Sequence, residues 1–285
     1  MSSNEQMKQT RRADKKLETL ELNIKHLKRV IATLQEENIG LKKQIDSVKR
    51  DQIEYLQNVS HQLVAPLNAI KWHVENLTEG RYSNIERITK VLRSIYSQAT
   101  ISVHLAKNFA LMSNLEADHK LTALKEPPSK VNIFRLLVNL SDDFQPLAWD
   151  KDVQIQVLDD PFETVPDVWA IKNLVSQVFS NIIENAVKYS KSNTTISVSG
   201  FHDSTDNTVC IKISNFGIPL PEGQLEQVFV RGFRTPEARN TYPAGTGFGM
   251  YIAKRIVDIH DGEIRCTKGE NGLTIFEVKL KVKPS

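Results

Sequence analysis

A seven-residue repeat of apolar side chains runs through the first 50 residues of the chain. Its a and d positions are filled, with charged residues around them, by Leu17, Leu20, Ile24, Leu27, Ile31, Leu34, Asn38, Leu41, Ile45 and Val48. This repeat is typical of a coiled coil. The polar residue at an a position, Asn38, favours a parallel, in-register, two-stranded coil, because two asparagines can pair across the seam. A solvated helix with one chance polar residue is the alternative.

The repeat shifts its register just before a histidine. A strict repeat would next use Gln52 and Tyr55, but the apolar residues there are Ile53 and Leu56. Such a slip changes the supercoil locally. It marks either a place that transmits rotation along the helix or the junction of two modes of packing.

The seam then continues to Leu77, and the spacing puts His61 beside it, where the imidazole should face solvent. A neutral imidazole held on a rigid helix can act as a nucleophile, although most surface histidines are simply solvated. Pro66 removes a backbone donor and predicts a kink just past the histidine.

A helical hairpin is expected in residues 51–126. Gly80 suits a helix C-terminus and Ser83 the next N-cap, so residues 78–83 read as a turn between two helices. The second amphipathic helix covers about residues 88–116. Dimerisation of such a hairpin through the coiled coil would produce a four-helix bundle.

The prolines at residues 127 and 128 mark a domain boundary, and the pattern beyond them is mixed. We expect helices at residues 131–149, 168–189 and 248–260. Strands are expected at residues 153–157, 195–201, 209–214, 263–267 and 273–281. The fold class is therefore α plus α+β, with a mostly antiparallel sheet layered under helices in residues 127–285.

Composition excludes several classes of function. The 37 basic and 34 acidic residues leave a net charge of +3, which is too small to indicate a nucleic-acid partner. No apolar run approaches a membrane span, and the polar start is not a signal peptide, so a cytoplasmic protein or the cytosolic piece of a longer receptor is expected. Cys210 and Cys266 lie singly in strand-like runs, as packing residues of a reducing compartment do.

Three polar residues share one face of the helix expected at 168–189. Asn181, Asn185 and Lys188 follow one another at spacings of four and three. Two amides and an ammonium suit a magnesium–phosphate complex, because an asparagine carbonyl can be one of the oxygen ligands of Mg²⁺. A polar stripe facing solvent is the other interpretation.

Three further motifs follow. Residues 213–221 form a strand that runs into a glycine and proline turn, and residues 227–234 mix aromatic with basic side chains. Gly245-Thr246-Gly247-Phe248-Gly249 then opens a helix, whose bare amides and positive end can meet phosphate oxygens. This loop lacks the Lys-Ser/Thr of a P-loop and follows no strand, so the dinucleotide fingerprint does not fit.

The order of histidine helix, asparagine helix, glycine turn, aromatic-basic segment and triple-glycine loop resembles that of a sensor histidine kinase of two-component signalling, from about residue 51 to 285. The resemblance implies a dimerising phosphotransfer bundle followed by a Bergerat-type ATP-binding domain with an α/β-sandwich fold. It makes His61 the phosphoacceptor and Asn185 the magnesium-binding asparagine. Asn181 stands where ATP-hydrolysing relatives carry a glutamate that activates water.

The same resemblance assigns the rest of the nucleotide site. Lys188 matches a phosphate contact and Tyr189 a residue that lines the pocket. Gly245, Gly247 and Gly249, with Thr246 and Phe248 between them, match the second glycine box. Residues 234–244 would form a short ATP lid.

The chain departs from the family pattern at three positions. Gln62 replaces the acidic residue that usually follows the histidine; its amide can orient the imidazole but cannot accept a proton. Ala65 replaces a threonine or asparagine that positions water for dephosphorylation of the partner. Asn215 replaces the aspartate that binds the adenine amino group, and its carbonyl can still accept that bond, while Gly217 keeps the glycine of the turn.

Three functions are compatible with these residues. The first is an ATP- and Mg²⁺-dependent homodimeric kinase that phosphorylates His61 and passes the phosphoryl group to an aspartate in the receiver domain of a response regulator. The second is a dimeric scaffold that binds nucleotide or a partner without phosphotransfer. The third is an ATPase that uses the cycle mechanically, against which Asn181 stands in place of a glutamate.

Overall fold

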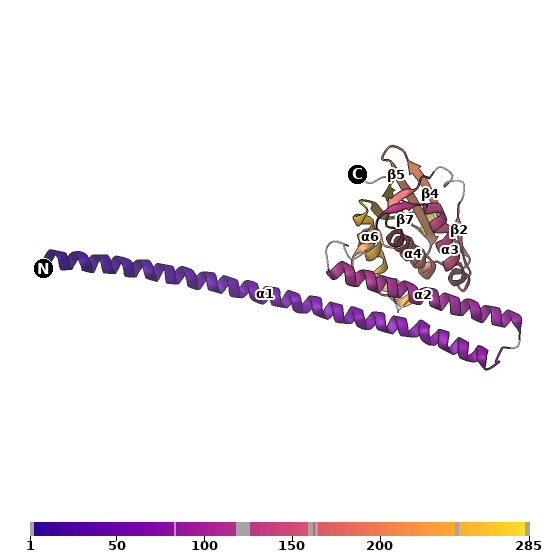
Figure 1. Cartoon of the computed structure of the whole chain (residues 1–285), viewed down its shortest axis with the longest axis horizontal. Coiled ribbons are helices and arrows are strands. Elements are labelled where there is room, and N and C mark those ends of the chain that lie inside the picture. Colours follow the sequence, from indigo (N-terminus) through magenta and orange to yellow (C-terminus); the bar gives the residue numbers. More distant parts are fainter. Residues whose placement is uncertain are drawn as a thin grey trace. The chain divides into compact units, whose positions relative to one another are not determined.

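The computed structural model describes residues 3–82, 84–117, 126–158, 162, 165–242 and 245–282, and Figure 1 shows the whole chain. Two compact units divide the chain, residues 1–57 and 58–285. The division of the chain into three domains at residues 50 and 126 stays a prediction.

The first unit is the amino-terminal part of one long helix, α1 (Ser3–Thr78). The seam positions whose side chains are described are more than half exposed; they are Leu20, Leu27, Ile31, Leu34, Leu41 and Ile45. Leu17, Ile24 and Val48 lie outside the described side chains. A row of exposed leucine and isoleucine fits the expected coiled coil, which nonetheless stays a prediction.

In the second unit, α1 passes Pro66 and ends at Thr78, so the expected kink does not interrupt the helix. Its end has the hydrogen bonds of a Schellman motif. The Arg81 N–H donates to the Asn76 carbonyl at 3.1 Å, and Gly80 has the left-handed φ of +67° that such an end requires. The expected glycine C-terminus is therefore confirmed.

The second helix of the hairpin, α2 (Ile85–Ala117), closely follows the expected range. Ser83, expected as its N-cap, lies outside the described residues. Asn84 accepts a hydrogen bond from the Glu86 N–H at 2.9 Å, which satisfies one of the free donors of the first turn.

The remaining residues of the second unit form a five-stranded sheet with helices on one face. The strand order is β2 (Val153–Val157), β4 (Thr194–Asp203), β5 (Thr208–Phe216), β7 (Leu273–Lys281) and β6 (Glu263–Lys268). Only β2 and β4 of this sheet pair in parallel, and the other neighbours are antiparallel. The expected mostly antiparallel sheet is thus confirmed.

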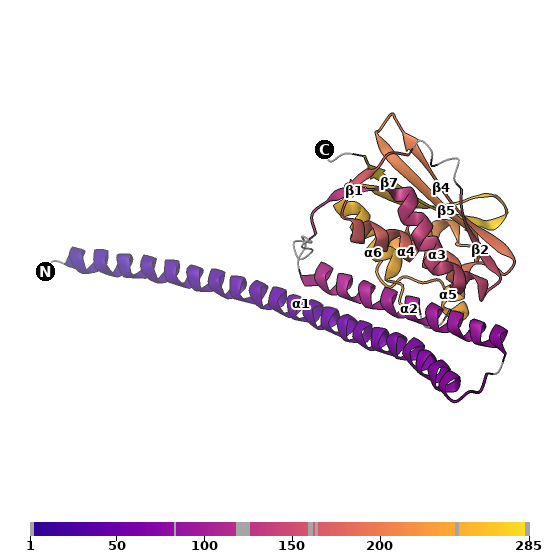
Figure 2. The same ribbon diagram turned by 45° about the vertical axis from the view of Figure 1, so that its right-hand side comes forward.

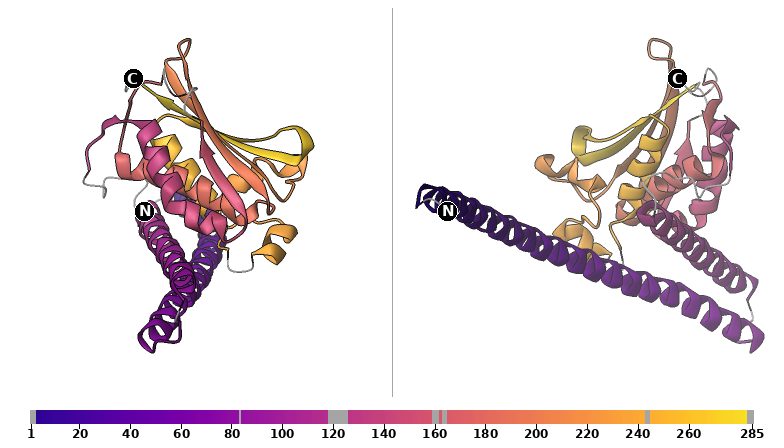
Figure 3. Two further views of the ribbon diagram at one scale, coloured as in Figure 1. Left: turned by 90° about the vertical axis from the view of Figure 1, so that its right-hand side faces the viewer. Right: turned by 60° about the vertical axis from the view of Figure 1, so that its left-hand side comes forward.

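Three helices cover the sheet: α3 (Ile133–Trp149), α4 (Lys172–Tyr189) and α6 (Gly249–Ile259). Figures 2 and 3 show all three on the same face. The strands alternate buried with half-exposed residues, which is the pattern of a sheet with one face packed on helices. Ile196, Ile211 and Ile213 are among the fully buried side chains of this core.

Two helix starts differ from expectation. Residues 129–131 form strand β1 (Ser129–Val131), which pairs antiparallel with β3 (Val168–Ala170). The expected helix at 131–149 therefore starts at Ile133, and the one at 168–189 starts at Lys172. The Asn132 side chain caps α3 by accepting from the Arg135 N–H at 2.8 Å.

Cys210 and Cys266 are both buried in the sheet as free thiols, as expected. Burial raises the pKa of each thiol to about 12. Both sulfurs therefore stay protonated and act as packing atoms. Across the described residues, no helix combines the length and apolar character that a bilayer crossing requires.

Candidate functional site

A cavity that is open to solvent lies at the carboxyl half of α4 and the start of α6. Most of the residues expected to act in catalysis or to bind a nucleotide line it, namely Gln62, Asn181, Asn185, Lys188, Tyr189, Asn215, Gly245, Thr246, Gly247 and Gly249. His61, Gly217 and Phe248 are not among the lining residues. The structure thus brings together predicted site residues from four separated segments of the sequence.

Helix α4 supplies the polar floor of the cavity. Ile182, Ile183 and their apolar neighbours turn inward and are fully buried, which fixes the rotation of the helix. Asn181, Asn185 and Lys188 therefore face the cavity together, as the spacing predicts. The stripe thus lines a cavity and not an open outer face, while its binding of a magnesium–phosphate complex stays a prediction.

The sequence reasoning missed Glu184, which lies beneath Lys188. Its carboxylate lies 2.7 Å from the Lys188 ammonium, and the same ammonium lies 4.9 Å above the ring of Tyr242. Burial works against both charges, but their mutual attraction outweighs it, so the pKa of Lys188 is raised and that of Glu184 is lowered. Both groups are therefore charged at neutral pH, and the pair could have been read from its i,i+4 spacing.

A second contact to Glu184 comes from α2. The Nδ1 atom of His104 lies 3.7 Å from the Glu184 carboxylate, and its ring packs edge-on against Phe144 at 4.9 Å. His104 is only 6 % exposed. Burial lowers the pKa of His104 although the Glu184 carboxylate pulls it upward.

This histidine predicts a dependence of stability on pH. Lys107, Lys188 and Asp143 are the other charged groups near it. Because its folded pKa is lowered, the unfolded chain binds the proton more readily. Stability should therefore be full above the unfolded pKa of about 6.5 and fall as the pH drops below it. In urea unfolding, His104→Gln should lose less stability between pH 7 and pH 5 than the unaltered protein.

His202, which is half-buried near the end of the sheet domain's strand β4, provides the matched control. A His202→Gln variant should keep the unaltered fall in stability between the two pH values. Equal falls in the His104→Gln and unaltered proteins would contradict the prediction.

The turn after β5 is tied to the end of α4. Gly217 forms a bridge with Ser190, and a Cβ atom on Gly217 would lie 2.4 Å from the Tyr189 carbonyl oxygen. Only glycine fits such a close approach of two backbones. The Asn215 amide donates to the Ser190 hydroxyl at 3.2 Å, which leaves its carbonyl as an acceptor at the cavity.

The triple-glycine loop ends where α6 begins. Gly247 has a φ of +73°, and its carbonyl accepts from the Gly232 N–H at 3.2 Å. No side chain caps the helix start at Phe248. The first amides of α6 and its positive end are therefore suited to an anion such as phosphate.

Two neighbouring glycines of this loop should differ in their tolerance of alanine. A Cβ on Gly247 would lie 2.8 Å from backbone atoms of Gly232 and Phe233 and would force a left-handed residue, whereas one on Gly249 would lie 3.5 Å from Asn181. Gly247→Ala should therefore lower the free energy of unfolding by roughly 1–3 kcal/mol. Gly249→Ala should change it by much less, and equal losses in chemical denaturation would contradict this reasoning.

Arg234 forms hydrogen bonds along the segment expected to be the lid, residues 234–244. The Arg234 guanidinium donates to the carbonyls of Ala238 and Gly245, both at 2.6 Å, and to that of Tyr242. These carbonyls end the short helix α5 (Pro236–Thr241) and lead into the glycine loop. Residues 243 and 244 of the expected lid lie outside the described residues.

The histidine helix contributes one residue to the cavity. Gln62 lines it, and the side chain of His61, the preceding residue, is exposed as expected. Asn108 and Leu105 of α2 also line it. Neither was expected, since the sequence does not tell which face of α2 meets the sheet domain.

Comparisons with known proteins agree with this arrangement. Residues 170–284 match the family of histidine kinase-, DNA gyrase B- and HSP90-like ATPases. The chain is 27 % identical over 232 residues to the sensor protein kinase WalK of Staphylococcus aureus. This alignment covers 80 % of this chain and 54 % of that relative. The same alignment covers 36 % of WalK of strain JH9. The chain thus spans about half of the first relative and about a third of the second.

A likeness to a solved structure concerns the fold. Full-length ShkA in complex with AMPPNP has a TM-score of 0.53 and 18 % identity, with coverage of 81 % of this chain and 46 % of that one. With the family match and the WalK alignment, this places an ATP-binding domain behind a helical region. The chain is therefore related to the sensor histidine kinases of two-component signalling and carries their ATPase domain.

Proposed function

We propose that the chain is an ATP-dependent protein-histidine kinase that phosphorylates His61. The observation that supports this most is that Gln62, the residue next to His61, lines the same cavity as Asn185, Lys188 and the glycine loop. His61 itself is exposed and free to receive a phosphoryl group. His61 and the residues that line the cavity belong to the same compact unit, residues 58–285, which supports the proposal.

Asn185 is the proposed magnesium residue. Its side chain lines the cavity, whereas the nearby carboxylate of Glu184 is engaged by Lys188 at 2.7 Å. The described residues contain no cluster of three or more His, Cys, Asp or Glu that could hold a metal by itself. One amide oxygen beside a phosphate site fits Mg²⁺, which takes its other ligands from phosphates and water. When bound, the ion would neutralise phosphate charge.

The other residues position the nucleotide. The Asn215 carbonyl would accept from the adenine amino group, and Lys188 with the amides at the start of α6 would hold phosphate oxygens. A ring nitrogen of His61 then forms a bond to the γ-phosphorus as the bond to the ADP oxygen breaks. The remaining ring proton leaves to solvent, because the amide of Gln62 cannot accept it.

The proposed assembly is a homodimer of cytoplasmic location. Exposed apolar positions along α1 would pair as a parallel coiled coil in residues 1–50, and the hairpins of residues 51–126 would form a four-helix bundle. Leu67, Leu92 and Val103 are more than half exposed and would be covered there. The phosphoryl group would pass from His61 to an aspartate of a response regulator, with the N–P bond broken and an O–P bond formed.

The test is incubation of the protein with γ-labelled ATP and Mg²⁺. Phosphohistidine is labile in acid and stable in alkali, so the proposal expects label with that behaviour. Nucleotide binding without label would instead indicate a scaffold. Steady release of phosphate over many turnovers without labelled protein would indicate an ATPase.

A Gln62→Glu substitution should speed the labelling of His61. A carboxylate beside the imidazole can accept the ring proton that an amide cannot, and a positioned base contributes about 10²-fold or more in favourable cases. The initial rate of labelling measures this, with Gln57→Glu on the same helix as a control for added charge. An equal or slower rate in Gln62→Glu would mean that the base lies elsewhere.

A further inference from the structure

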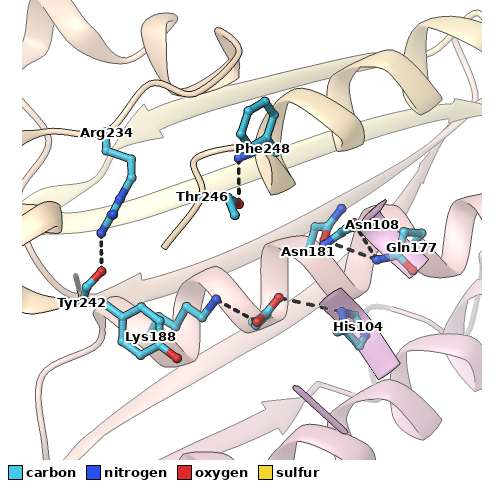
Figure 4. A network of polar contacts seen from close by, with 10 residues as sticks. His104, Asn108, Gln177, Asn181, Lys188, Arg234, Tyr242, Thr246 and Phe248 are labelled. Atoms are coloured by element: carbon cyan, nitrogen blue, oxygen red, sulfur yellow. Dashed lines mark hydrogen bonds and ion pairs between the residues drawn. The ribbon is translucent and has the colours of Figure 1, made fainter. Parts of the chain in front are cut away.

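Three amide side chains join α2 to α4 beside the cavity. The Asn108 amide nitrogen donates to the Asn181 carbonyl oxygen at 2.8 Å, and the Gln177 amide nitrogen donates to the Asn108 carbonyl oxygen at 2.9 Å. Gln177 also donates to the same Asn181 oxygen at 3.4 Å. Figure 4 shows the three side chains and these contacts.

These contacts fix the orientation of the Asn181 amide. Its oxygen accepts from two donors, so a flipped amide would set its NH₂ group against two other NH₂ groups. The Asn181 nitrogen takes part in neither contact, because both donors meet the oxygen. That nitrogen is buried without a hydrogen-bond partner among the described residues, and Asn181 is 2 % exposed.

The unpartnered nitrogen belongs to a residue that borders the phosphate end of the cavity. Asn181 lines the cavity and lies next to Gly249, the first residue of α6, whose added Cβ would be 3.5 Å from the Asn181 oxygen. The positive end of α6 attracts anions to the same place. A buried donor left unmet is unfavourable, and an anionic oxygen would satisfy it.

We propose that Asn108 is a positioning residue for the nucleotide site. With Gln177 it holds Asn181 so that the amide nitrogen donates to a phosphate oxygen of the nucleotide, and the Asn181 carbonyl does not ligate magnesium. This proposal rests on the proposed function only in its need for ATP in the cavity. Which atom of the Asn181 amide faces the cavity would then depend on α2, a helix of the hairpin and not of the ATPase domain.

The test uses a substitution at position 108 that should turn over the side-chain amide of Asn181. An aspartate at position 108, ionised at pH 8, can only accept, so in Asn108→Asp the Asn181 nitrogen should turn to it and present the carbonyl to the cavity. The non-hydrolysable β,γ-imido analogue of ATP is the probe, measured by calorimetry with EDTA and with Mg²⁺. Metal-free binding should weaken by about tenfold, the scale of one lost buried hydrogen bond, while binding with Mg²⁺ should weaken less than about threefold.

The added charge needs its own control, because it repels metal-free nucleotide more than the magnesium complex. The same Asn108→Asp change is therefore repeated in an Asn181→Ala background. If the selective loss of metal-free binding disappears there, it acts through the Asn181 amide, as proposed. If it persists, charge alone is the cause and the proposal is wrong.

A neutral variant tests whether Asn108 has only a structural role. Asn108→Ala removes one donor to Asn181 but leaves that of Gln177, so binding should weaken modestly and by more in EDTA than in Mg²⁺. Equal weakening in both conditions, or none, would overturn the proposal. Circular dichroism confirms the fold of each variant.

Binding is read before any phosphoryl transfer, so the two proposals fail separately. A protein that binds the analogue as described but never labels His61 contradicts the kinase function alone. A protein that labels His61 but shows no change in Asn108→Asp contradicts the role of Asn108 alone.

Discussion

The His61→Gln variant is expected to take up no acid-labile label from γ-labelled ATP. Glutamine has no ring nitrogen that can attack phosphorus, so the loss should be complete and not partial. His61 lies outside the cavity lining, and the change should leave nucleotide binding intact. Filter-bound radioactivity and calorimetry on the same preparation measure the two quantities.

Two other histidines serve as controls. His26 is exposed on the same helix, and His202 is half-buried on the sheet, where it lies 3.4 Å from Asn207. Their glutamine variants should label at the rate of the unaltered protein. Full labelling of His61→Gln would assign the phosphoacceptor to another residue.

The second large effect is expected from Asn185→Ala. The substitution removes the proposed amide ligand of Mg²⁺ while Asn181 and Lys188 remain at the cavity. Loss of groups that only support a metal ligand costs about 10–100-fold, so loss of the ligand should weaken binding of the magnesium–ATP complex by on the order of 100-fold or more. Labelling of His61 should fall with it.

Asn173→Ala is the matched control for this change. Asn173 belongs to the first turn of the same helix, where its amide donates to the Glu126 carboxylate at 2.6 Å, and it does not line the cavity. This variant should bind magnesium–ATP normally. Unchanged metal dependence in Asn185→Ala would show that the ion is held elsewhere.

Local patterns predicted most of the secondary structure. Alternating residues gave strands close to β4, β5 and β7, and the glycine and polar residues near 80 gave the hairpin turn. The short strands β1 and β3 were missed because each has only three residues and pairs with a segment about 40 residues away, Ser129 with Ala170. Such pairing leaves no periodic signal in either segment.

The candidate site was predictable to the extent that it lies on one helix or in one loop. Spacing along α4 placed Asn181, Asn185 and Lys188 together, and the glycines marked the loop before α6. His104 and Asn108 could not be found in this way. Their importance comes from the packing of α2 on α3, α4 and α6, and that packing is set by tertiary contacts that no local pattern encodes.

The bridge between Gly217 and Ser190 would affect which ligands fit the cavity by their length. The turn at Asn215 is joined to the end of α4 by this bridge and by the hydrogen bond from Asn215 to Ser190, so the separation of Asn215 and Asn185 is restrained. Opening of the segment held by Arg234 would change access to the cavity but not the separation of these two residues. If a nucleotide binds as proposed, with its base at Asn215 and its phosphates at Asn185, the restrained separation of these two residues would favour molecules of matching length.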